Sequence, residues 1–75
     1  FNNATIISYS ISKDADVKLI IYDILGREAK ALVNERKRSG SYNILFTAEG
    51  LASGTYFAVL RTNSNTLIHK ILFIK

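Results

Sequence analysis

The sequence predicts an all-β fold, a small immunoglobulin-like antiparallel β-sandwich of about six to seven strands. Two observations carry this prediction. Apolar and polar residues alternate with a period of two along most of the 75-residue chain, as in strands whose successive side chains point to opposite faces. Turn-forming residues interrupt these runs at intervals of about 8 to 12 residues, which is typical of sandwiches and barrels.

Five runs show the alternation, at residues 5–11, 17–22, 42–47, 56–61 and 67–74. Each run places a set of apolar side chains on one face, which we expect to line the core. In the second run the other face is also apolar, because Ile20 and Tyr22 lie there. The expected core residues are Ile7, Tyr9, Ile11, Val17, Leu19, Ile21, Tyr42, Ile44, Phe46, Tyr56, Ala58 and Leu60.

The segment 27–38 is the one stretch whose composition favours a helix, since it is rich in Ala, Leu, Glu, Lys and Arg. Against this, Ala29, Ala31 and Val33 alternate, and a strand at about residues 28–34 would complete a hairpin with the preceding run. We expect a strand there.

Composition restricts the class of protein. The length suits one domain, residues 1–75, and 48% hydrophobic residues argue against disorder. Cysteine is absent, which excludes disulfides and thiolate metal sites. The longest apolar run, residues 56–60, is far shorter than the roughly 20 residues of a membrane span, and nothing resembles a signal peptide. The net charge of +4 favours acidic surfaces without selecting among them.

The segment "DILGRE", residues 23–28, raises the question of a phosphate-binding loop. It has one glycine, no following hydroxyl and an aspartate that repels phosphate. We expect a hairpin turn instead, in which Asp23 accepts hydrogen bonds from amides across the loop and Gly26 adopts a positive φ. The apolar tip, Ile24 and Leu25, is expected to fold back over the open end of the sandwich; the alternative is an exposed docking surface.

The basic segment "ERKRSG", residues 35–40, is expected to be a solvated hairpin tip whose turn glycine is Gly40. As a nucleic-acid patch it lacks aromatic residues, and Glu35 lies beside the basic ones. The alternative is a contact with an acidic receptor or lipopolysaccharide. We expect no nucleic-acid partner.

Candidates for chemistry are few. His69 has no second histidine or cysteine as a partner, and Ser53 lacks a nucleophile elbow. Asp14, Asp16 and Asp23 lack the acid spacing of a calcium loop. We therefore expect no enzyme activity and no catalytic, cofactor-binding or metal site.

The chain ends on an apolar run, "IHKILFIK", with a final lysine. We expect this run to pair with its neighbours and close the sandwich. A partner can also recognise such a strand by strand addition or through the charges of Lys70 and Lys75. An apolar edge strand carries a further possibility, a dimer formed edge to edge.

Three motifs occur in order along the chain. Their residues are Tyr22, Asp23, Gly26 and Arg27, then Leu51, Gly54 and Tyr56, then Lys70 and Lys75. With these motifs the sequence resembles the type A C-terminal sorting domain of the type IX secretion system, carried by secreted proteins of Bacteroidetes, over its whole length from Phe1 to Lys75. Two features depart from that family: no Asn-Pro pair precedes Phe1, and Ala29 stands where valine is common. Related modules of flagellar hook-capping proteins usually lack the lysine-ended last strand.

The resemblance implies a non-enzymatic address tag cut from a larger secreted protein. Such a domain follows its upstream cargo into the periplasm and is recognised by the type IX outer-membrane translocon, which delivers the cargo to the cell surface or medium. In many cargoes a sortase-like peptidase removes the tag and joins the cargo to an anionic lipopolysaccharide.

The expected recognition surface combines the loops around Gly26 and Gly54 with the chain end. The residues of that end are Lys70, Ile71, Leu72, Phe73, Ile74 and Lys75. The alternative function is an immunoglobulin-like structural or carbohydrate-binding module appended to a secreted enzyme. Joint exposure of Tyr9, Tyr22 and Phe57 would favour that alternative.

Overall fold

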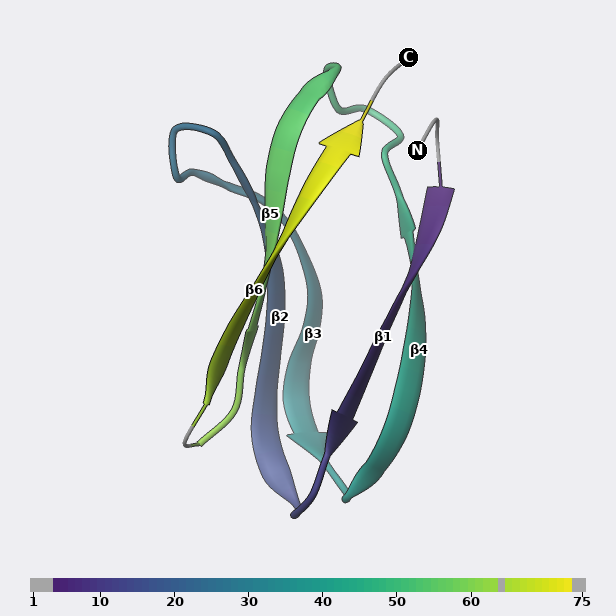
Figure 1. Cartoon of the computed structure of the whole chain (residues 1–75), viewed down its shortest axis with the longest axis vertical. Helices are drawn as coiled ribbons and strands as arrows, with labels where there is room; N and C mark the ends of the chain where they lie inside the picture. The colour runs from purple at the N-terminus through teal and green to yellow at the C-terminus, as the bar shows by residue number, and fades with distance from the viewer. Residues whose placement is uncertain (1–3, 64, 74–75) are drawn as a thin grey trace.

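Six strands in two antiparallel sheets form the domain, as the alternation predicts (Figure 1). The computed structural model describes residues 4–63 and 65–73, and no helix occurs among them. One sheet has the order β3-β2-β5-β6, and the other contains β1 and β4. The strands are β1 (Ala4–Ile11), β2 (Ala15–Asp23), β3 (Glu28–Lys37), β4 (Gly40–Thr47), β5 (Gly54–Arg61) and β6 (Thr66–Phe73).

The core lies between the two sheets and consists of the predicted alternating residues. Val17, Leu19 and Ile21 of β2 and Phe46 of β4 are at most 1% exposed. Ile7, Tyr42 and Ile44 are half-buried against the same cluster. Because β2 and β5 each bury one face almost completely, the register between these two strands is strongly specified.

The segment 28–37 is a strand, as expected, and not a helix. It pairs with β2 from Ala15↔Lys37 to Tyr22↔Glu28, with register shifts after Leu19 and after Ile21. The predicted alternation holds only in part, because the first shift pairs Ala31 with Ile20, and Ala31 is exposed while Val33 is buried. Pairing with a central strand satisfies backbone donors and acceptors that a surface helix would satisfy internally.

The prediction that residues 35–40 form the tip of a hairpin is wrong. β3 and β4 belong to different sheets, so the tight connection through Arg38 and Ser39 is a corner between the layers. The reason is burial, because β4 pairs with β1 and turns Phe46 onto the core side of the four-stranded sheet. The basic residues of the corner are exposed apart from the half-buried Lys37.

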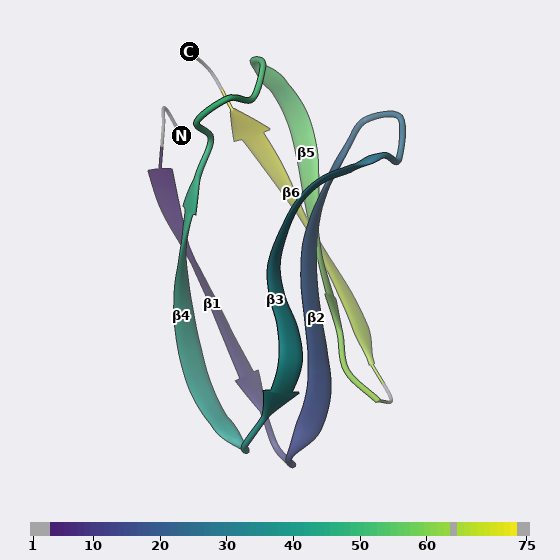
Figure 2. The ribbon, with the colours of Figure 1, turned by 180° about the vertical axis from the view of Figure 1, so that it is seen from behind.

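The loops divide between the two ends of the sandwich. Figures 1 and 2 show the β2–β3 loop, the start of β5 and the end of β6 at one end. The β3–β4 corner and the β1–β2 and β5–β6 connections lie at the opposite end. We refer to these as the Gly26 end and the basic-corner end.

Candidate recognition site

Two neighbouring rows across the four-stranded sheet bring together three motifs that are distant in sequence. In the first row Tyr22 pairs with Phe57, which pairs with Lys70. In antiparallel strands, paired residues point to the same face. This row therefore lies on the outer face of the sheet, where Tyr22 and Phe57 are half-buried and Lys70 is exposed.

The second row is one residue along each strand and faces the core. Asp23 pairs with Tyr56, which pairs with Ile71. Tyr56 and Ile71 are each 7% exposed. These two residues therefore contribute to the site through packing, while the first row presents side chains to solvent.

Asp23 closes the loop that follows the two rows. Its Oδ1 accepts hydrogen bonds from the amides of Leu25 and Arg27, both at 2.9 Å. Its Oδ2 accepts one from the Arg27 Nε, also at 2.9 Å. The Gly26 amide donates to the Asp23 carbonyl at 3.0 Å, and Gly26 has a φ of 81°. This is the predicted hairpin turn, with glycine where a side chain would be strained.

These hydrogen bonds also determine the charge state of the loop. The hydrogen bond from the Arg27 amide, reinforced by the Arg27 guanidinium and the Leu25 amide, lowers the pKa of Asp23 below its ordinary value. The fold thus favours the ionised form of this carboxyl, whose bonds preorganise the loop.

The tip of this loop is exposed, so the expectation that it folds back over the sandwich is wrong. Ile24 and Leu25 are 70% and 73% exposed. The carboxylate closes the loop on itself, and Figure 1 shows the β2–β3 loop bending to one side, away from the start of β5 and the end of β6. The loop thus presents two aliphatic side chains on a frame held by polar bonds.

The motif around Gly54 secures the connection beside this loop. The Tyr56 hydroxyl donates a 2.6 Å hydrogen bond to the Ala52 carbonyl, and the Leu51 amide donates to the Ala48 carbonyl at 3.0 Å. Gly54 pairs with Phe73, which aligns the connection with the end of β6. The segment "AEGLASG", residues 48–54, is one of the turn signals in the sequence, and Gly50, with a φ of 80°, is the residue that makes this turn.

The chain end divides between core and surface. Ile71 and Phe73 are buried, whereas Lys70 is exposed and Leu72 is 53% exposed. Ile74 and Lys75 lie outside the described residues. In the folded domain, Lys70 and Leu72 are thus the members of residues 70–73 that solvent reaches.

The sequence profile of the secretion-system C-terminal sorting domain family matches residues 1–75. The chain belongs to this family. The resemblance to the type IX sorting domain is thereby confirmed over the whole chain. No curated protein and no solved structure gave a significant match.

The turn glycine Gly40 lies away from the residues of the three motifs. Gly40 pairs with Ile11 at the basic-corner end. The structure therefore brings together Tyr22, Asp23 and Tyr56 with β6, but not Gly40.

The basic residues at that end interact with nearby acids and rings. Arg36 Nη1 lies 3.4 Å from Asp16 Oδ1, and Lys37 Nζ lies 2.8 Å from Glu35 Oε1. The hydrogen bond with Glu35 raises the pKa of Lys37, whose Nζ also lies 5.1 Å from the centre of the Tyr42 ring. Such pairing leaves less charge for an external anion.

The acidic residues of the sorting domain do not gather. Asp14 accepts a 2.8 Å hydrogen bond from the Ser39 amide at the basic-corner end, whereas Asp23 lies at the opposite end. Among residues 4–63 and 65–73, no three His, Cys, Asp or Glu residues are placed to hold a metal ion. The same residues include no helix that is long and apolar enough to cross a membrane.

The aromatic residues do not form a common exposed face. Tyr9 is only 9% exposed and stacks on Tyr42 with ring centres 5.3 Å apart. Tyr22 and Phe57 lie together on the outer face of the other sheet, half-buried. The joint exposure that would favour a carbohydrate-binding module is not found.

Proposed function

We propose that this domain is a non-catalytic secretion signal, which directs an upstream cargo through the type IX outer-membrane translocon to the cell surface or medium. The family match over residues 1–75 carries the proposal, because a sorting domain of this family implies a cargo in the same chain and contact with the secretion machinery. Export to the surface or medium follows from the same membership.

The recognition surface in this proposal is the Gly26 end. There the exposed tip, Ile24 and Leu25, lies on a loop held by Asp23 that bends to the side of the sheet (Figure 1). The outer row ending in Lys70 adds an aromatic pair and a cation beside it. Exposed apolar groups on a preorganised frame favour protein contact, since little conformational entropy is lost on binding.

The later steps are also part of the proposal. The domain folds in the periplasm, and a sortase-like peptidase then cuts at or before its start and joins the cargo to an anionic lipopolysaccharide. The placement of β1 suits this order, because β1 begins at the same end of the sandwich where β6 ends (Figure 1). A cargo attached before β1 would therefore be connected to the domain next to the proposed recognition surface.

A reporter fusion tests the proposal. A signal peptide, a fluorescent protein and residues 1–75 are expressed in a type IX-competent bacterium and in a strain without the translocon. We expect surface or medium fluorescence only in the competent strain. Periplasmic retention of a folded fusion in the competent strain would contradict the proposal.

A pair of double variants tests the surface itself. Ile24→Ser with Leu25→Ser removes the apolar tip, and we expect export to fall about tenfold or more, as for loss of about 1.4 kcal/mol of binding. Ile6→Ser with Leu45→Ser is the matched control, because these two are register partners that are 64% and 60% exposed on the other sheet. Equal export by both variants would exclude the tip from recognition.

A further inference from the structure

A row of polar side chains crosses the outer face of the four-stranded sheet, toward the basic-corner end. Lys18 lies between the buried residues Val17 and Leu19, so its own side chain points away from the core. Residues paired with it in neighbouring strands point to the same outer face. Across β3, β2, β5 and β6 the row consists of the exposed residues Asn34, Lys18, Arg61 and Thr66.

The two cations at the centre of this row are register partners. Residues directly opposite each other in an antiparallel pair have Cβ atoms about 4.5–5.5 Å apart, and like charges there are destabilising. Within residues 4–63 and 65–73, no carboxylate forms an ion pair with Lys18 or Arg61. Asp16, the next outward residue of β2, instead pairs with Arg36 at 3.4 Å. The strand register therefore holds together two charges that an external anion would neutralise.

The surroundings of the pair indicate what kind of anion fits. Asn34 and Thr66 flank the cations with an amide and a hydroxyl, so the row itself carries no negative charge. An oxyanion with several oxygens, such as a phosphate group, can accept hydrogen bonds from both cations at once. The edges of β2 and β5 are already paired, because both are inner strands of the sheet. A ligand therefore meets side chains here and cannot add a strand.

The adjacent row on the same face is apolar. Ile68 in this row is 67% exposed and Ile20 is half-buried. Outward side chains of successive rows are about 7 Å apart along a strand. A lipid bilayer offers groups at a similar separation, because its phosphates lie about 5–10 Å from the boundary with the acyl chains. The members of the apolar row are Ala31, Ile20, Val59 and Ile68.

We infer that this face of the domain binds the surface of an anionic lipid bilayer. Lipid phosphate groups lie between Lys18 and Arg61, and Ile68 contacts the boundary with the acyl chains. The uncompensated cation pair beside an exposed apolar row carries the inference. It goes beyond the secretion function and does not rest on it, since neither Ile24 nor Leu25 takes part and no cargo is needed.

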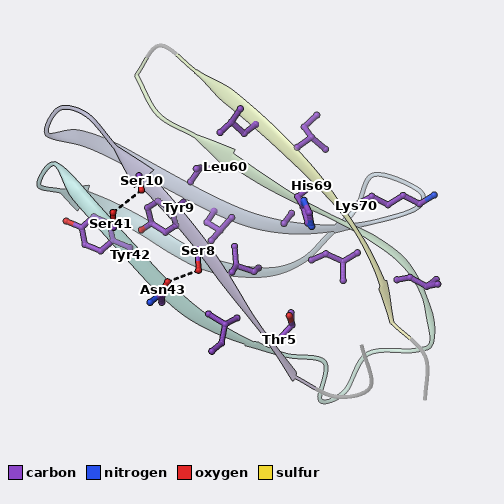
Figure 3. Close-up of a pocket in the computed structure, with 18 residues that line it drawn as sticks. Thr5, Ser8, Tyr9, Ser10, Ser41, Tyr42, Asn43, Leu60, His69 and Lys70 are labelled. Carbon is purple, nitrogen blue, oxygen red and sulfur yellow. Dashed lines mark hydrogen bonds between the residues drawn. The ribbon is translucent and has the colours of Figure 1, made fainter.

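The two faces of β6 supply a matched pair of apolar residues for the test. Ile68 pairs with Val59 on the outer face. Leu67 pairs with the buried Leu60 on the core side, where it contributes to a groove of about 960 Å³ between β1 and β6 (Figure 3). Ile68 is 67% exposed and Leu67 is 63% exposed. Replacing either by serine thus removes a similar exposed apolar side chain from opposite faces.

The first test is flotation of the 75-residue chain with lipid vesicles. We expect binding to phosphatidylglycerol vesicles that weakens as salt is added, and binding about tenfold weaker or less to phosphatidylcholine vesicles, which carry no net charge. Lys18→Gln with Arg61→Gln should weaken binding to phosphatidylglycerol about tenfold or more. Lys13→Gln with Arg38→Gln is the control, because it removes the same charge from exposed residues outside the row. The control should weaken binding by about threefold or less.

The second test uses the matched apolar pair. Ile68→Ser should weaken vesicle binding about fivefold or more, whereas Leu67→Ser should leave it unchanged. Circular dichroism checks that each variant folds. Folding is expected for the charge variants, because removing a like-charge pair relieves repulsion between β2 and β5.

Several outcomes overturn the inference. They are equal binding to the two lipids, equal losses from the two charge variants, and equal losses from Ile68→Ser and Leu67→Ser. Inorganic phosphate that saturates NMR shifts of amides 18 and 61, with no vesicle binding, would assign the cation pair to a small phosphate ligand. Polyglutamate that binds through the pair, again with no vesicle binding, would assign it to an acidic polypeptide. Success or failure of the reporter fusion does not enter these tests.

Discussion

The two ends of the sandwich differ in which side chains their connections expose to solvent. At the Gly26 end, the charged groups of the loop bond to the loop itself, and its apolar side chains project. At the basic-corner end, Arg36 pairs with Asp16 on the neighbouring strand and Lys37 pairs with Glu35 on the same strand, and the rings of Tyr9 and Tyr42 stack on each other nearby. The basic segment at residues 35–40, which stands out in the sequence, is thus partly neutralised by nearby acids. Ile24 and Leu25, which do not stand out, form the exposed apolar feature of the molecule.

The largest expected effect concerns the backbone of the Gly26 loop. Gly26→Val should lower the free energy of unfolding by about 1–3 kcal/mol, because a β-branched residue resists a φ of 81°. Urea unfolding followed by circular dichroism measures the change. Gly26→Asn should cost less, since asparagine tolerates this conformation; equal costs would show that φ is not the cause.

The two ends should also respond to opposite extremes of pH. The lowered pKa of Asp23 means that its contribution to stability is present at neutral pH. That contribution is lost as pH falls below about 4, through the unfolded value and then the folded one. Urea midpoints measured across the acid range should therefore fall, and Asp23→Asn should flatten this dependence. An unchanged acid limb in the variant would contradict the assigned role.

Alkali should act on the basic-corner end. Burial raises the pKa of Tyr9, and the hydrogen bond with Glu35 raises that of Lys37. In both cases the folded state holds its proton longer, so stability is present below the unfolded pKa and falls as pH rises above about 10. Tyr9→Phe should reduce the decline in urea midpoint. A decline as steep as in the wild type would exclude Tyr9 as its source.

The smallest effect is expected from the basic residues themselves. Replacing Arg36, Lys37 and Arg38 by glutamine should leave reporter export unchanged and shift the melting temperature by no more than a few degrees, since exposed ion pairs contribute little. Export assays and calorimetry check this. Loss of export in a folded variant would reverse the assignment of the two ends.

Sequence reasoning was most successful where the cause is local. The alternation of Val17, Leu19 and Ile21 predicted the buried face of β2, and the spacing of Asp23 and Gly26 predicted their turn. It was wrong for Ile24 and Leu25, because whether a loop tip meets an apolar surface depends on the direction in which the loop bends, and this loop bends away from the start of β5 and the end of β6 (Figure 1). The prediction of a hairpin at residues 35–40 was wrong because the alternation of apolar and polar residues indicates where strands lie but not to which sheet each strand belongs.

By itself, then, the sequence determined the strands, the buried faces of β2 and β5, the Asp23 turn and the family. Each of these follows from side chains only a few residues apart, or from motifs in order. Tertiary structure alone decided that Tyr22, Phe57 and Lys70 share one row, and that Leu67 faces inward yet stays uncovered. Strand partners are chosen by long-range burial, which depends on the whole set of faces at once and not on any one run.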